Sequence, residues 1–141
     1  MTEASNALQA APPRRAWVIW VARILSALPV LLMLFSGFLK LSNNPNVIDA
    51  FTGKYGYPKA SLVPIGVIEI TSAVLYAIPR TAGLGALLTA AYLGGAVATH
   101  VRAGEPFLAP VLVGIAAWAG LYLRDERVRA LLPLRRDSGQ A

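Results

Sequence analysis

The chain has 141 residues, of which 56% are hydrophobic and 14% are charged, whereas soluble domains carry roughly 25% charged residues. It contains no cysteine, which excludes disulfides, thiolate metal sites and cysteine nucleophiles. The formal net charge is +6, and the basic residues cluster at the ends of the chain. This distribution favours anionic lipid headgroups over nucleic acid as the partner, so the composition predicts an integral membrane protein that binds no nucleic acid.

Four apolar runs predict an all-α protein, an integral membrane four-helix bundle. We expect the spans at residues 16–41, 62–78, 82–99 and 107–123. Each run reaches the roughly 17 residues that a helix needs to cross the hydrocarbon core. Residues 1–15 are polar and are expected to form a disordered cytoplasmic tail. Residues 124–141 are expected to form a basic cytoplasmic tail.

The connections between the runs predict how the spans are arranged. The longest connection is polar, from Ser42 to Ser61, and the partial helical spacing of its apolar residues predicts a short interfacial helix. Pro79-Arg80-Thr81 predicts a tight turn between the second and third spans. The connection from His100 to Pro106 is also short. Consecutive spans are therefore expected to be antiparallel, in an up-down topology.

The basic residues predict the orientation of the spans, because Lys and Arg are enriched in cytoplasmic segments. Four spans place both termini on one side of the membrane. Nine of the 13 Lys and Arg residues lie on that side and four on the other. Both termini are therefore expected in the cytoplasm.

Small residues recur every fourth position along the third span. The row that we expect to form a helix-packing seam contains Ala86, Ala90, Gly94 and Ala98, and it begins at Ala82. Small residues at this spacing let neighbouring helices approach closely in lipid. Two interpretations remain open, a seam between helices of one chain and a seam that also packs against a second copy in a homo-oligomer.

Three titratable residues on three different spans are predicted to meet in the non-cytoplasmic half of the bundle. Lys40 ends the first span and His100 ends the third on that side, while Glu69 lies in the second span, about 10 Å deep. An ionised group at such a depth is costly and usually has a partner or a function. Tyr92 is the candidate aromatic wall of such a polar pocket.

Each of these residues also has an ordinary interpretation. Lys40 can extend to the headgroups, His100 can be an interfacial residue, and Tyr92 can be a core aromatic. Glu69 can hold helices together, either protonated or bonded to Lys40 or to a hydroxyl. The functional alternative is a proton-accepting or headgroup-binding Glu69 in an outward-facing pocket.

No catalytic residue and no metal site are predicted. A single histidine and the absence of cysteine argue against a transition-metal centre or a haem held by two histidines. The sequence has no phosphate-binding loop and no Ser-His-Asp set of suitable spacing. Catalysis by this chain alone is therefore not expected.

Several short motifs, in order and spacing, resemble the DoxX-like family of small four-span membrane proteins. The first motifs are Phe35-Ser36-Gly37-Phe38-Leu39-Lys40-Leu41, Gly56-Tyr57-Pro58, Gly66 and Glu69. The later ones are Pro79-Arg80-Thr81, Gly94-Gly95-Ala96, Thr99-His100 and Trp118. The resemblance covers about residues 22–133 and implies a four-helix integral membrane fold in the bacterial cytoplasmic membrane.

Three functions are consistent with this resemblance and with the residues. The first is an accessory or scaffold subunit without independent catalysis, which recruits a membrane protein partner. The second is a quinone- or lipid-interacting component of a membrane redox system that uses Glu69 and His100, and quinone is the one cofactor considered. The third is a small oligomeric transporter.

Overall fold

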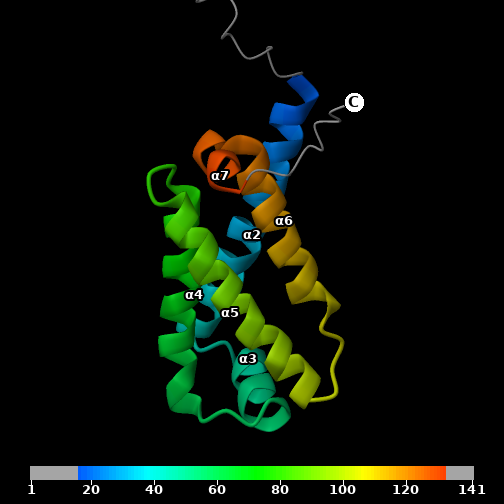
Figure 1. Cartoon of the computed structure of the whole chain (residues 1–141). Helices are drawn as coiled ribbons and strands as arrows, with labels where there is room; N and C mark the ends of the chain where they lie inside the picture. The colour runs from blue at the N-terminus through cyan, green and yellow to red at the C-terminus, as the bar shows by residue number, and fades with distance from the viewer. Residues whose placement is uncertain (1–15, 133–141) are drawn as a thin grey trace, which may run out of the picture.

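The computed structural model describes residues 16–132, and within that range the chain is helical and has no strand (Figure 1). The long helices are α2 (Ala16–Leu41), α4 (Leu62–Ala77), α5 (Ala82–Arg102) and α6 (Leu108–Arg124). The short elements are α3 (Pro45–Asp49), the π-helix η1 (Ala50–Lys54), the 3-10 helix η2 (Lys59–Ser61) and α7 (Glu126–Leu131). The tail expected at residues 1–15 lies outside the described residues, as does the 133–141 part of the tail expected after residue 123.

Three of the helices are long and apolar enough to cross a membrane. These are α2 with 26 residues, the continuous helix of η2 and α4 with 19, and α5 with 21. The fourth long helix, α6, is apolar but has 17 residues. The segment expected as a short interfacial helix contains α3 and η1, after which the chain turns at Gly56 and Pro58.

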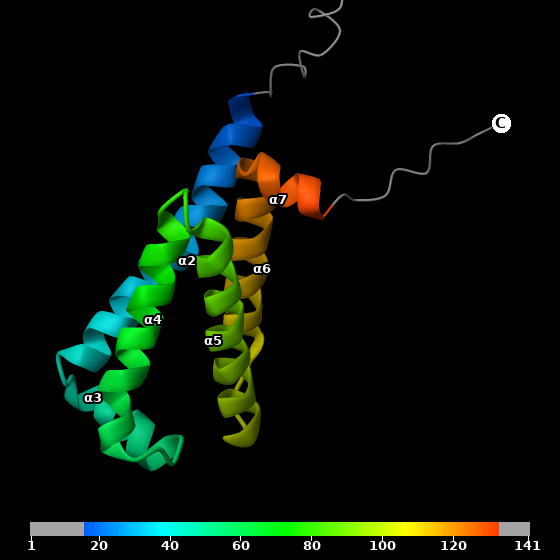
Figure 2. The same ribbon diagram turned by 60° about the vertical axis from the view of Figure 1, so that its left-hand side comes forward.

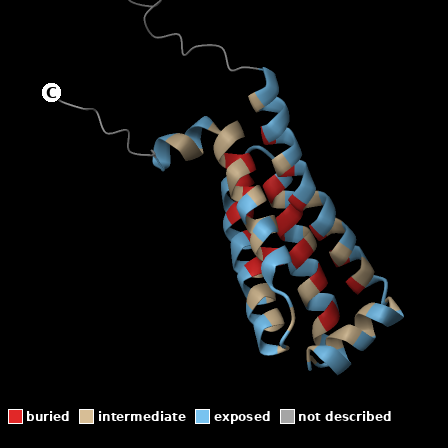
Figure 3. Cartoon of the chain, turned by 90° about the vertical axis from the view of Figure 1, so that its right-hand side faces the viewer, coloured by how far each residue is buried: buried red, intermediate tan, exposed pale blue. Residues whose placement is uncertain are grey.

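The four long helices pack around a shared interior. Helix α2 contacts α4 and α6, and α5 contacts the same two helices from the other side (Figures 1 and 2). Figure 3 shows that the buried positions lie on the inward faces, while the outward faces are exposed. The outward faces carry large apolar side chains such as Leu31, Phe35 and Leu87, as expected for helices that face lipid.

Glycines at the helix crossings allow the backbones to approach closely. A Cβ at Gly85 of α5 would meet the backbone of Tyr76 in α4. A Cβ at Gly120 of α6 would lie 2.6 Å from Ser26 Oγ in α2. Side chains at these positions would force the helices apart, so both crossings depend on glycine.

The small-residue row on α5 packs within the chain only over its first half. Ala82 and Ala86 are buried, whereas Ala90, Gly94 and Ala98 are exposed. The reason is geometric: Ala90 and Gly94 line a hollow between α5 and α6 instead of a packed helix crossing. A Cβ at Gly94 would meet no atom within 4 Å.

Candidate functional site

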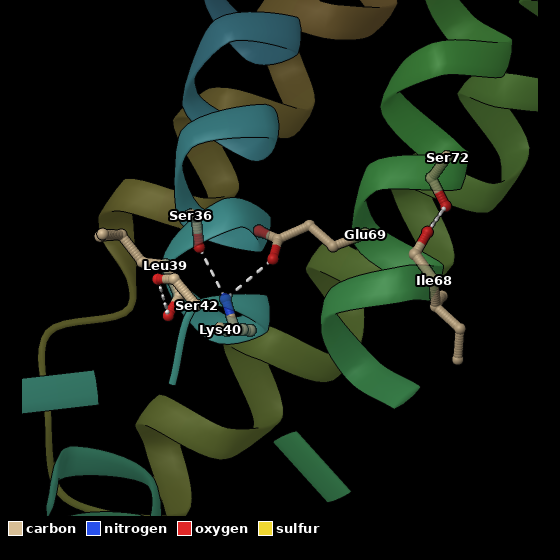
Figure 4. A network of polar contacts seen from close by, with 7 residues as sticks. All are labelled: Ser36, Leu39, Lys40, Ser42, Ile68, Glu69 and Ser72. Atoms are coloured by element: carbon tan, nitrogen blue, oxygen red, sulfur yellow. Dashed lines mark hydrogen bonds and ion pairs between the residues drawn. The ribbon is translucent and has the colours of Figure 1, made fainter. Parts of the chain in front are cut away.

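A buried ion pair joins α2 to α4. Lys40 Nζ lies 2.8 Å from Glu69 Oε2, and the two side chains are 8% and 4% exposed. Ser36 Oγ accepts a second hydrogen bond from Lys40 Nζ at 2.6 Å. Figure 4 shows the two charged side chains reaching toward each other from their helices. Charges withdrawn from water in this way are expensive unless they are paired and hydrogen-bonded.

Two glycines bring Lys40 and Glu69 within reach of each other. Gly37 precedes Lys40 by three residues, and Gly66 precedes Glu69 by the same interval. Residues at this spacing share one face of a helix. A Cβ at Gly66 would lie 3.0 Å from Lys40 Cβ and 3.3 Å from Gly37 O. The glycines therefore set the close crossing of α2 and α4, one helical turn from the ion pair.

The ion pair lines a cavity of about 500 Å³ inside the bundle. The four residues predicted for a polar pocket, Lys40, Glu69, Tyr92 and His100, all line this cavity. They come from α2, α4 and α5. The remaining lining residues are Leu32, Met33, Ser36, Phe51, Tyr55, Tyr57, Ile65, Ala91, Leu93, Gly95, Ala96, Thr99 and Val113.

One wall of the cavity consists of aromatic rings that the sequence pattern did not assign to the pocket. Phe51, Tyr55 and Tyr57 come from the connection between α2 and α4. The Phe51 ring centroid lies 6.2 Å from that of Tyr55 and 5.5 Å from that of Tyr57. Tyr55 in turn lies 5.5 Å from the His100 ring. The signal in the sequence was the concentration of rings in an otherwise polar connection.

His100 presents one ring nitrogen for further chemistry. Its Nδ1 lies 2.8 Å from the carbonyl oxygen of Ala96. A carbonyl can only accept a hydrogen bond, so Nδ1 carries the proton. In the neutral ring Nε2 is then an acceptor, and the ring can take up a second proton.

Lys40 also has hydrogen-bonding capacity left. An ammonium group has three N–H donors, and two of them are directed to Ser36 and Glu69. Among the described residues, the third donor has no hydrogen-bond partner. Tyr92 of α5 and the Glu69 carboxylate line the same cavity. The cavity therefore offers a hydrogen-bond donor from Lys40 and an acceptor, Nε2 of His100.

A second hollow, of about 510 Å³, lies between α5 and α6. Ala90 and Gly94 of the predicted seam line it from α5, and Gly114 and Trp118 line it from α6. Its lining, within the described part of the chain, contains no charged side chain. Residues 16–132 contain no group of three His, Asp or Glu residues placed to hold a metal ion.

These features define a small helical membrane protein with a buried ion pair beside an internal cavity. A scan against family models matches residues 24–120 to the DoxX-like family. The chain belongs to the DoxX-like family, and the resemblance noted in the sequence is confirmed. Comparisons with curated proteins and with solved structures gave no match.

Proposed function

We propose that α2, α4, α5 and α6 all cross the bacterial cytoplasmic membrane, as an antiparallel bundle with both termini in the cytoplasm. On the side of the termini lie Arg23 in the first part of α2, Arg80 in the turn between α4 and α5, and Arg124 at the end of α6. On the opposite side lie Lys40, Lys54, Lys59 and Arg102. In this arrangement nine of the 13 Lys and Arg residues of the sequence belong to the side of the termini, which agrees with the enrichment of cytoplasmic segments in Lys and Arg. The cavity then lies in the outer half of the membrane.

We further propose that the cavity binds a membrane-soluble quinone, and that the protein is an accessory subunit of a membrane redox system. The observation that carries this proposal is the buried Lys40–Glu69 pair, which lines the cavity of about 500 Å³. Sites for small molecules are mostly apolar cavities of this size with a few convergent polar groups. A buried pair within a membrane-spanning region is usually functional.

The chemistry of a quinone fits the groups that line the cavity. A quinone carbonyl would accept a hydrogen bond from the third N–H of Lys40, and the aromatic wall would contact the ring. Oxidation of the quinol releases two electrons and two protons. A partner redox protein would take the electrons, while the Glu69 carboxylate and Nε2 of His100 would accept the protons from the two oxygens. This division gives the chain ligand binding and proton transfer, and leaves electron transfer to the partner.

A phospholipid headgroup is the competing occupant. Its phosphate would interact with Lys40, and its apolar chains would lie between the helices. The two ligands differ in shape, because the quinone presents a flat ring to the aromatic wall. Competition between them is therefore part of the test.

The test is equilibrium binding of a short-chain benzoquinone to the full chain in lipid nanodiscs. Glu69→Gln should weaken binding about tenfold, since 1.4 kcal/mol of lost interaction changes an equilibrium constant by that factor. Ser72→Ala is the matched control on the same helix, because among residues 16–132 Ser72 Oγ bonds only the Ile68 carbonyl, and Ser72 does not line the cavity. Equal affinity for wild type and Glu69→Gln would overturn the proposal. Displacement of the quinone by anionic phospholipid, but not by zwitterionic phospholipid, would favour the headgroup.

A further inference from the structure

We propose that residues 45–57 form a lid over the outer mouth of the cavity, which must open for a ligand to enter or leave. The biological meaning of this lid rests on the proposed function, but its opening can be measured without any ligand. The lid consists of α3, η1 and the turn that follows. Its aromatic side chains face the cavity, whereas Thr52, Gly53 and Lys54 are exposed.

The lid is weakly anchored to the rest of the fold by apolar packing. Neither α3 nor η1 contains a buried residue. Segments with few buried apolar contacts belong to the least stable part of a protein and open locally at low cost. A π-helix such as η1 is rare, and such helices are found frequently at functional sites.

Three polar contacts hold the lid against the end of α5 and the turn after it. The Tyr57 hydroxyl lies 2.7 Å from Thr99 Oγ1. Arg102 Nη2 donates to the Tyr55 carbonyl at 2.6 Å, and its guanidinium lies 5.0 Å from the Tyr57 ring centroid. Farther out, Lys54 Nζ lies 2.8 Å from Glu105 Oε1. We call these three contacts the latches.

The backbone provides pivots at both ends of the lid. Asn43, just before the lid, has a φ of 53°, a left-handed conformation that Asn tolerates better than most residues. Gly56, at its far end, has a φ of +68°. Rotation at these two positions would swing Phe51 and Tyr55 away from the cavity. The hydrogen bonds of the Lys40–Glu69 pair would stay in place, because they join residues of α2 and α4, whereas the contact of Lys40 Nζ with the Phe51 ring centroid at 5.8 Å would be lost.

The lid and the ion pair therefore have separable roles. The ion pair binds the polar group of the ligand, and opening of the lid sets how fast the ligand exchanges with the aqueous side. The latches limit access to the cavity. Their partners outside the lid are Thr99, Arg102 and Glu105, from α5 and the turn after it. Of these, only Thr99 lines the cavity.

The natural absence of cysteine allows a direct test. Ala96→Cys places a single thiol on the cavity wall, and its reaction with a charged, membrane-impermeant thiol reagent is followed in detergent micelles. Tyr57→Phe and Arg102→Gln should each raise the reaction rate about two- to tenfold, the effect of one hydrogen bond of ordinary strength. Thr99→Val should match Tyr57→Phe, because both remove the same contact. Thr52→Val is the control on the lid, since within the described part of the chain its hydroxyl bonds only the Ile48 carbonyl.

Equal rates in the latch variants, the control and the otherwise unsubstituted Ala96→Cys protein would overturn the lid. A defect in quinone binding alone would leave these rates unchanged, so failure of the lid and failure of the proposed function are distinguishable.

A second experiment holds the lid closed with a covalent linker instead of weakening its contacts. Lys54→Cys with Glu105→Cys, joined by a reducible bifunctional thiol linker, should slow quinone dissociation at least tenfold, and reduction should restore the rate. An unchanged dissociation rate would mean that the ligand leaves through the lipid side, and would also overturn the proposal.

Discussion

The amino group of Lys40 lies 2.8 Å from the carboxylate of Glu69, with both side chains withdrawn from solvent. Each residue follows a glycine at the helix crossing by three positions. The close approach of two backbones and the pairing of two charges are therefore parts of one arrangement. This arrangement places a full ion pair on the wall of a cavity instead of in a sealed seam.

Removing either charge alone should destabilise the protein more than removing both. Lys40→Met leaves Glu69 without its cation, and Glu69→Leu leaves Lys40 without its anion. Breaking a buried pair in this way costs about 3–5 kcal/mol, while replacing both partners by apolar residues is often nearly neutral. The free energy of unfolding of each of the three variants is measured in mixed micelles. Additive losses in the double variant would show that the two charges are not coupled.

Two glycines of α5 should respond oppositely to the same substitution. Gly85→Ala places a methyl group against the Tyr76 backbone, and overpacking of this kind costs about 1–3 kcal/mol. Gly94→Ala meets no atom within 4 Å, so it should be neutral or slightly stabilising, because alanine favours a helix more than glycine does. Thermal unfolding of the two variants side by side checks the difference. A larger loss for Gly94→Ala than for Gly85→Ala would contradict the α4–α5 crossing.

Tyr76 should contribute to stability through its hydroxyl group. The hydroxyl donates to the Ala117 carbonyl at 2.6 Å and links α4 to α6. Tyr76→Phe should cost about 1 kcal/mol, the net value of one hydrogen bond. Tyr122→Phe is the matched control on α6, because the Tyr122 hydroxyl has no hydrogen bond to any residue between 16 and 132. If both variants unfold at the same temperature, the bond contributes no measurable stability.

The pKa of Lys54 should depend on Glu105. The hydrogen bond with Glu105 raises the pKa of Lys54 above its ordinary value of 10.5. A raised pKa means that the contact stabilises the closed lid below the ordinary pKa of lysine, and that this contribution is lost as the pH rises through the higher value. Glu105→Gln should lower the pKa of Lys54, as followed by an NMR titration of its side chain. The same titration at high salt should show a smaller difference between the two proteins, because exposed charges are screened.

The spacing of apolar residues and turns predicted the long helices closely. Helix α2 has the bounds expected for the first run, α4 ends one residue before the second run does, and α6 begins and ends one residue later than the fourth run. Helix α5 continues three residues beyond Thr99 to Arg102. That extension depends on tertiary contacts, because Arg102 is held by the Tyr55 carbonyl.

The sequence predicted the site residues that lie on the long helices, but not those in the connection between α2 and α4. Helical periodicity alone orients the four predicted pocket residues toward one region of the bundle. The positions of the Tyr55 and Tyr57 rings depend instead on a π-helix and a left-handed glycine, which no periodicity describes. The small-residue row did not show that only Ala82 and Ala86 are buried within the chain, since spacing alone cannot show where two helices separate, and a seam with a second copy stays a prediction.

The central claim is that the cavity beside Lys40 and Glu69 holds a quinone. The most direct measurement is photolabelling of the full chain in proteoliposomes with an azido-substituted short-chain benzoquinone, followed by mass spectrometry of the labelled peptides. We expect adducts on Phe51, Tyr55, Tyr57 or Tyr92, suppressed by excess unlabelled quinone and reduced in Glu69→Gln. Adducts confined to outward-facing residues such as Leu87 and Ile115, with no effect of the competitor, would contradict the claim.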